Sequence, residues 1–184
     1  MKIKRLLYLF GLLLALTFFT ARAGCAQPKP ETKAPVITRS FAVDKGSHGY
    51  IWKIYIEAED PNGDMFKIAS VVDQPGVGHY PTDWVMLKPQ YRHHLKGYLQ
   101  WNLFSPYGYL REWTDITLKV SIFDKAGNES NVVVFPFTFQ TGAKDQYNYK
   151  LPAPFDEGDL PRLGHIAIDL VPPENGYTEA EPPN

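Results

Sequence analysis

The clearest structural signal in the sequence lies at residues 50–59, which read YIWKIYIEAE. Every second side chain in this stretch is apolar: Tyr50, Trp52, Ile54, Ile56 and Ala58. The positions between them include Lys53, Glu57 and Glu59, so one face of an extended chain is apolar and the other is mostly polar. A period of two with one apolar face predicts a half-buried β-strand rather than a helix.

Similar short segments occur on both sides of this strand, separated by turn residues. The turn that follows it, residues 60–64, reads DPNGD and supplies an Asn-Gly pair for positive φ. The other strand-like segments are 36–43, 66–72, 84–87, 98–104, 116–122 and 132–139. Pro136 has no amide donor, which places the last segment at a sheet edge or beside a bulge. Seven short strands predict an all-β fold, a sandwich of two sheets over residues 36–141.

Two of these segments resemble a known family. Residues 56–64, IEAEDPNGD, resemble the strand–turn–strand element of bacterial immunoglobulin-like and cadherin-like modules. Residues 120–130, VSIFDKAGNES, resemble the penultimate strand and final turn of those modules. The resemblance implies an immunoglobulin-like, two-sheet antiparallel sandwich, and it specifies an architecture rather than an activity. Residues 76–111 depart from the family pattern because they are longer and richer in aromatic side chains.

The N-terminus has the layout of an export signal. A basic start with Lys2, Lys4 and Arg5 precedes an uncharged apolar run at residues 6–19. Small residues at the end of the segment then suit a signal peptidase. The run is shorter than the roughly 18 residues that a membrane span requires. Residues 1–24 are therefore predicted to be a signal peptide.

The only cysteine of the chain stands directly after this segment. Ala23-Gly24-Cys25 resembles the end of a bacterial lipobox, which implies that Cys25 is lipidated. Arg22 stands where that motif usually carries an apolar residue, and plain secretion with a free thiol is the alternative. Residues 25–35 are polar and contain three prolines, which predicts a flexible tether. The expected location is an outer-membrane lipoprotein or a periplasmic or secreted protein, with a lipid as its only contact with the membrane.

Residues 142–184 differ in composition from the rest of the chain. They hold 3 basic and 8 acidic residues and 7 of the 16 prolines, which predicts a flexible, acidic, Pro-rich tail. Like charges repel, so nucleic acid is not an expected partner. Residues 164–171 are the exception, because Ile166, Ile168 and Leu170 alternate with other side chains. This piece predicts an extra strand that docks on its own domain or on a partner.

Oxygen-bearing side chains gather in two turns that an immunoglobulin-type topology would bring to one pole. The first turn offers Asp60, Asn62 and Asp64, which stand at alternate positions. The second turn offers Asp124 and Asn128, with Glu129 beside them. Calcium takes six to eight oxygen ligands in flexible geometry, so these side chains predict a calcium site. The alternative is that tight turns simply use Asp, Asn and Gly.

Aromatic residues gather between positions 80 and 113. The candidates for ligand binding are Tyr80, Trp84, Tyr107, Tyr109 and Trp113. Flat rings with a polar tip suit both sugar stacking and protein interfaces, and some rings in this stretch, such as Trp101, must belong to the core. A surface glycan and an envelope protein are therefore both candidate partners.

No nucleophile elbow, phosphate-binding loop or metalloprotease motif is present in the sequence. The spacing of the histidines does not indicate a metal site. We therefore expect a non-catalytic binding or structural accessory domain that mediates protein interaction at the bacterial envelope, without a cofactor except calcium. A carbohydrate-binding module is the alternative, and a small secreted hydrolase with two carboxylates in a cleft is a remote one.

Overall fold

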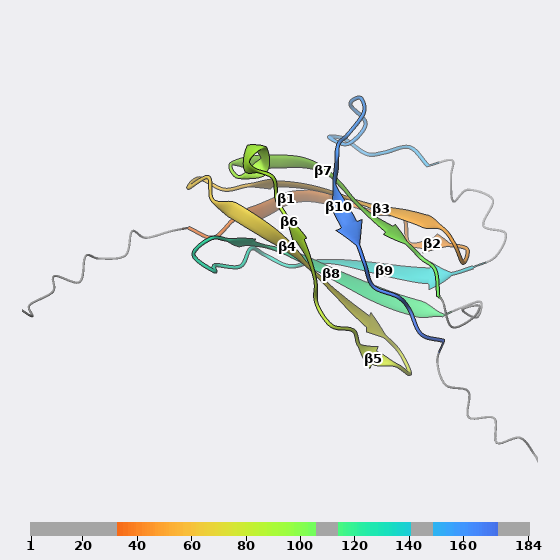
Figure 1. Ribbon diagram of the computed structural model, residues 1–184. Coiled ribbons are helices and arrows are strands. Elements are labelled where there is room, and N and C mark those ends of the chain that lie inside the picture. The colour runs from red at the N-terminus through yellow and green to blue at the C-terminus, as the bar shows by residue number, and fades with distance from the viewer. Residues whose placement is uncertain (1–32, 106–113, 141–148, 173–184) are drawn as a thin grey trace, which may run out of the picture. The chain divides into compact units, whose positions relative to one another are not determined.

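Strands with one apolar face account for most of the secondary structure. The computed structural model describes residues 33–105, 114–140 and 149–172, and these ranges form an all-β sandwich of two mixed sheets (Figure 1). The four-stranded sheet has the order β1 (Val36–Phe41), β3 (Ile51–Glu59), β7 (His94–Asn102) and β10 (Arg162–Ile166). No helix among the described residues is long and apolar enough to cross a membrane.

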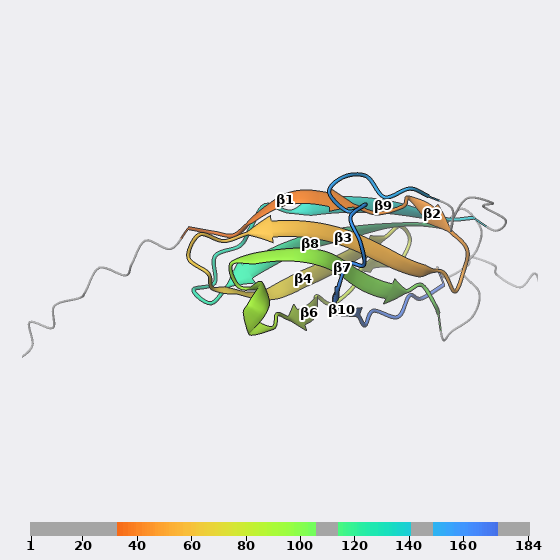
Figure 2. The same cartoon turned by 90° about the horizontal axis from the view of Figure 1, so that it is seen from above.

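The second sheet has six strands and lies against the first (Figure 2). Its order is β2 (Lys45–Gly46), β9 (Val133–Phe139), β8 (Asp115–Asp124), β4 (Met65–Gln74) and β5 (Gly78–His79). The sixth strand, β6 (Asp83–Met86), also pairs with β4, and a short 3₁₀ helix, η1 (Pro89–Tyr91), follows it. β2 pairs with Thr138 and Phe139, so among the described residues no strand pairs with β9 beside Pro136 on its outer side, and β9 is an edge strand there.

The core lies between the two sheets. In β3 the inward side chains Trp52, Ile54 and Ile56 have no exposed surface, as the alternation in the sequence predicts. The Trp52 ring packs 4.7 Å from the Phe137 ring of the opposite sheet, centroid to centroid. Each fully buried side chain of this size contributes about 1.5–3 kcal/mol to folding, so the shared core holds the two layers together.

The prediction that the sandwich is antiparallel throughout is wrong at two strand pairs. β10 runs parallel to β7, and β2 runs parallel to β9. Hairpins force neighbouring strands to be antiparallel, whereas strands joined by long connections are free to pair in either direction. Both exceptions join strands that are far apart in the sequence.

The C-terminal residues 149–172 pack on the sandwich, beyond the boundary at residue 141 that the sequence analysis placed. Phe155 is 1% exposed on the outer face of the four-stranded sheet. A set of apolar side chains farther along enters the core: Leu163, Ile166, Ile168 and Leu170. The strand in this region covers residues 162–166, whereas the sequence pattern suggested 164–171. Ile168 and Leu170 are buried without being part of a strand.

Candidate functional site

A patch of exposed apolar side chains lies on the outer face of the six-stranded sheet. The register of β4 with β6 and β8 places Met86 and Phe123 on either side of Lys67. Trp84 stands in the adjacent row, opposite Ala69. Trp84 is 43% exposed and Met86 is 54% exposed. We call Lys67, Trp84, Met86 and Phe123 the Trp84 surface.

The rings of the Trp84 surface are held in a fixed arrangement. The centroids of Trp84 and Phe123 lie 5.4 Å apart at an interplanar angle of 68°, which is an edge-to-face contact. The ammonium of Lys67 lies 3.7 Å from the Trp84 centroid and 5.7 Å from the Phe123 centroid. In the described ranges no carboxylate forms an ion pair with Lys67. Within the described ranges the surface therefore presents apolar rings and a cation that no carboxylate neutralises.

Charged groups that lie farther from Trp84 on the same outer face form ion pairs and hydrogen bonds. Lys119 lies 2.6 Å from Asp73, and His79 contacts the same carboxylate. The hydrogen bond from Lys119, and then that from His79, holds the pKa of Asp73 below its usual range. Beside Phe123, the Ser121 hydroxyl donates to Glu129 Oε1 at 2.7 Å. These pairs form a polar rim around the Trp84 surface.

The aromatic residues predicted to bind a ligand do not share one environment. Tyr80 is partly buried, and its hydroxyl donates to Gln74 Oε1 at 2.6 Å and accepts the Val171 amide at 2.8 Å. Burial raises the pKa of the Tyr80 hydroxyl. Its polar tip is thus engaged within the fold, whereas Trp84 faces outward. The predicted residues Tyr107, Tyr109 and Trp113 lie outside the described residues.

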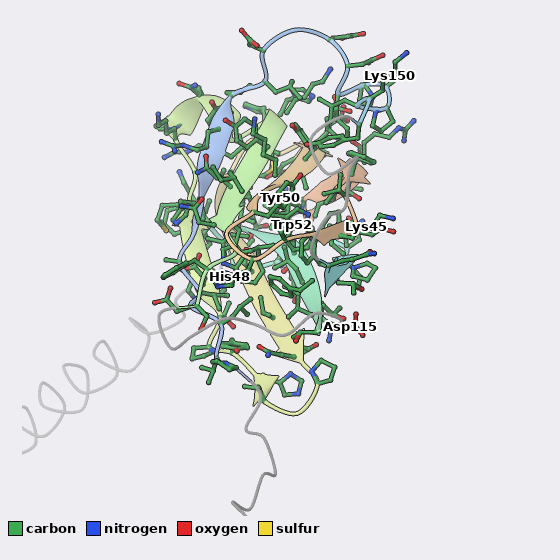
Figure 3. All side chains as sticks on the ribbon, turned by 90° about the vertical axis from the view of Figure 1, so that its right-hand side faces the viewer. Lys45, His48, Tyr50, Trp52, Asp115 and Lys150 are labelled. Atoms are coloured by element: carbon green, nitrogen blue, oxygen red, sulfur yellow. The ribbon has the colours of Figure 1, made fainter. Side chains whose placement is uncertain are left out.

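Figure 3 shows the end of the sandwich at which β7 ends and β8 begins. There the Trp52 indole donates to the Val43 carbonyl at 2.8 Å. His48 Nε2 accepts the Ser105 amide at 3.2 Å. The first bond ties the loop at Val43 to β3, and the second joins the loops that contain His48 and Ser105.

The two acidic turns meet, because the Lys125 amide donates to the Asp64 carbonyl at 3.0 Å. The carboxylate oxygens of Asp60 accept the amides of Asn62 at 2.9 Å and of Asp64 at 3.1 Å. The carboxylate of Asp124 accepts the backbone amide and the side-chain amide of Asn128 at 2.8 and 2.7 Å. Most of the predicted calcium ligands are therefore used to brace their own turns.

Asp64 is the exception in this cluster. Its Oδ1 atom is buried and has no hydrogen-bond partner. Burial, followed by the hydrogen bond and the charge of Asp60, raises the pKa of the Asp64 carboxyl. Asn62 turns away and donates to the Lys33 carbonyl at 3.0 Å. Across the part of the chain that the structure describes, no three His, Cys, Asp or Glu side chains are arranged to hold a metal ion.

A shallow hollow of about 560 Å³ lies on the outer face of the four-stranded sheet. Its lining includes the carboxylates of Glu57 and Glu59, with Arg39 and Pro154 opposite them. Glu57 is 3.3 Å from His94 Nε2. The hollow is open to solvent and so does not provide the enclosed cleft that glycoside hydrolysis favours.

No family model matches the sequence, and no curated protein matches it.

Proposed function

We propose that this chain is a non-catalytic, exported binding domain of the bacterial envelope that holds a protein partner on the Trp84 surface. One observation carries the proposal, namely the exposure of Trp84 and Met86 side by side on a sheet face. Monomeric proteins rarely leave large apolar patches in water unless the patch makes contact with something. Rings, a thioether and an ammonium suit contact between surfaces rather than bond making.

The composition of the Trp84 surface resembles that of a protein-binding hot spot. Tryptophan is enriched at such sites, and methionine adapts to the shape of a partner. The exposed part of Trp84 amounts to roughly 100 Å², which is worth about 2.5 kcal/mol when a partner covers it. The Lys67 ammonium, which pairs with no carboxylate of the described residues, favours a partner with a carboxylate at the matching position. The rim of paired charges adds little affinity.

An immunoglobulin-like topology is part of this proposal. The order β1-β3-β7 in one sheet and β6-β4-β8-β9 in the other corresponds to the order A-B-E and C′-C-F-G of that fold, which supports it. The Trp84 surface then lies on the C′-C-F-G face. β10 lies beside β7, at the position that strand D has in the immunoglobulin fold.

Export and anchoring rest on residues 1–24 and Cys25 alone. Metabolic labelling with a fatty-acid analogue, compared between the natural chain and Cys25→Ala, tests the lipid anchor. Label on the natural chain and none on the variant supports an outer-membrane lipoprotein. Export without label supports a periplasmic or secreted domain.

Calcium binding by the paired acidic turns is a separate proposal, supported by the buried and unpartnered Oδ1 atom of Asp64. Isothermal titration of calcium into the purified protein tests it, with Asp64→Asn as the matched variant. Heat and a raised melting temperature in the natural protein alone would support the site. No heat at millimolar calcium would remove it.

Site-directed photo-crosslinking in the cells that make the protein tests the protein-binding proposal. A photoreactive phenylalanine replaces Met86 on the Trp84 surface, or Ile51, which is 50% exposed on the other sheet, as the matched control. We expect a discrete adduct of higher mass from the Met86 position, none from Ile51, and at least a tenfold weaker adduct when Trp84→Ala is added. Equal adducts from both positions would contradict the proposal.

A surface glycan is the second candidate partner, because an exposed indole can stack on a sugar ring. The Lys67 ammonium already stands over one face of the Trp84 ring, which leaves less of the indole free for stacking. This contact favours a protein over a glycan. Binding on a glycan array that Trp84→Ala abolishes would reverse that preference.

A further inference from the structure

Residues 149–160 cross the outer face of the four-stranded sheet (Figures 1 and 2) but do not cover it completely. Between this segment and the side chains of β3 and β7 lies a hollow of about 380 Å³. We call it the charged hollow, because its lining includes Lys53 of β3 and Asp159 of the segment. The other side chains and backbone groups that line it belong to Tyr55, Tyr98, Leu151, Gly158 and Leu160.

A second hollow of about 380 Å³ adjoins the charged hollow. Lys53, Tyr55 and Leu151 line both of them, so one continuous surface runs from the first to the second. Each volume falls within the range of about 300–1,000 Å³ that small-molecule sites occupy. We call the second one the apolar hollow, because rings and an aliphatic side chain line the part that it does not share: Tyr50, Ile51 and Tyr149.

The charged hollow holds a cation and an anion that do not neutralise each other. Among the described residues, neither Lys53 nor Asp159 forms an ion pair. Elsewhere on the same face the segment does pair with the sheet, because Lys96 Nζ of β7 lies 3.4 Å from Glu157 Oε2. Charges of both signs therefore line one space in which a ligand with both charges can bridge them.

The base of the charged hollow is formed before any ligand arrives. The Lys53 ammonium lies 4.8 Å from the centroid of the Tyr98 ring. The Tyr98 ring lies 5.7 Å from the Tyr55 ring, which in turn lies 5.7 Å from the buried ring of Phe155, centroid to centroid. Packing on both sides fixes these rings, so a ligand does not have to pay for ordering them.

We propose that the two hollows together bind a free α-amino acid with a large apolar side chain. The Lys53 ammonium receives the carboxylate of the amino acid, and the Asp159 carboxylate receives its ammonium group. The side chain of the amino acid lies in the apolar hollow, against the rings of Tyr50 and Tyr149. The site lies on the opposite sheet from the Trp84 surface, so neither proposal rests on the other.

The two charges favour an amino acid over a sugar. A neutral sugar offers no charge to either side chain, and an acidic sugar offers a partner to Lys53 alone. Neither kind of sugar has an apolar group of the size that the apolar hollow accepts. A zwitterion with an apolar side chain uses all three features, namely the cation, the anion and the rings.

Titration of the purified protein with L-phenylalanine, followed by ¹⁵N NMR of the backbone amides, tests this proposal. We expect saturable shifts at Lys53, Tyr98 and Gly158, with a Kd of about 1 mM. Glycine has no side chain for the apolar hollow and should bind at least about tenfold more weakly. The absence of saturable shifts up to about 20 mM phenylalanine overturns the proposal, as does binding of glucuronate in place of phenylalanine.

Two analogues of the amino acid test the role of each charge. L-Phenylalaninamide lacks the carboxylate, and N-acetyl-L-phenylalanine lacks the ammonium group. We expect the natural protein to bind each of them about threefold to tenfold more weakly than phenylalanine. Lys53→Met should bind phenylalanine and its amide equally, whereas Asp159→Asn should bind phenylalanine and its N-acetyl form equally.

Lys88→Met is the matched control, because Lys88 is exposed beside η1 and lines neither hollow. It should keep the preference of the natural protein for phenylalanine over both analogues. Each comparison uses two ligands on one variant, so the ratio of affinities does not depend on the fraction of chains that are folded. A preference for the carboxylate that survives in Lys53→Met, or that disappears in Lys88→Met, overturns the proposal.

Discussion

The outer faces of the two sheets both carry aromatic side chains, but the described residues cover only one of these faces. On the four-stranded sheet, Tyr55 lies 5.7 Å from Tyr98 and 5.7 Å from Phe155, centroid to centroid, and is only 5% exposed. Burial under the C-terminal segment raises the pKa of the Tyr55 hydroxyl. On the six-stranded sheet, Trp84 and Met86 stand in solvent.

The difference shows that this fold can shield an outer face when a segment of the chain crosses it. Residues 149–160 do so on one side, with Phe155 as the apolar anchor. In the described ranges no segment crosses the Trp84 surface. An aromatic face that is covered contributes to stability, whereas one that is left open has its apolar area free for a partner.

Phe155→Ala gives the largest expected effect, and it tests whether the covered face stabilises the fold. Removing a fully buried phenylalanine costs about 3–5 kcal/mol in free energy of unfolding. Urea denaturation followed by tryptophan fluorescence measures that loss. Phe104→Ala is the matched control, because Phe104 is 53% exposed, and we expect a loss of less than about 1 kcal/mol there. Similar losses in the two variants would contradict the distinction between a covered and an open position.

Gly164→Ala tests the close approach of the C-terminal segment to the sandwich edge. The added methyl would overlap Val85 Cγ1, and we expect a loss of about 1–3 kcal/mol in free energy of unfolding. Val85→Ala in the same chain removes the obstructing methyl groups. A double-mutant cycle from melting curves should show that the second substitution recovers part of the loss. Strictly additive losses would mean that the segment does not pack here.

The alternation in the sequence predicts the strands well, because it is a local property. Residues 50–59 correspond to β3 at 51–59, and residues 116–122 lie within β8 at 115–124. The covering of one face could not be predicted in this way. Phe155 meets Tyr55 across a hundred residues of sequence, and no local pattern reports such a contact. The two parallel pairs escaped prediction for the same reason.

The Trp84 surface was visible in the sequence only in part. Trp84 belongs to the predicted ligand-binding set, but Lys67, Met86 and Phe123 do not. Phe66 has the same two-residue spacing as the buried Ile68, yet Phe66 is 37% exposed and Met65 is fully buried. A β-bulge between Met65 and Lys67 shifts the register with β8 and reverses the faces at this point. Bulges depend on strand pairing, which the sequence of a single strand does not contain.

Trp84→Ala tests whether the exposed aromatic face of the six-stranded sheet serves binding rather than stability. The substitution removes the contacts with Lys67 and Phe123 but opens no cavity in the core, so we expect a loss of about 1 kcal/mol or less in free energy of unfolding. The variant should fold and yet fail to form the cross-link proposed from position 86. Urea denaturation of the purified variant checks the first part, and the crosslinking yield in cells, with the photoreactive residue at position 86, checks the second. A loss as large as that of Phe155→Ala would mean that Trp84 is a structural residue.

Asp73→Asn gives the smallest expected effect, because it changes only the rim of the open face. The pKa of Asp73 is lowered in the folded protein, so its ionised form adds stability above the unfolded value of about 3.9, and that contribution disappears as the pH falls through the lower folded value. The asparagine variant lacks this contribution. We expect it to be less stable than the natural protein at pH 7 by under about 1 kcal/mol, with the difference vanishing in acid. Lys119→Met should reproduce the same pH profile, because Lys119 is the main cause of the lowered pKa. Melting temperatures between pH 2 and 7 measure the difference in stability between each variant and the natural protein. A difference that persists at low pH would show that the Asp73 side chain acts through packing rather than through its charge.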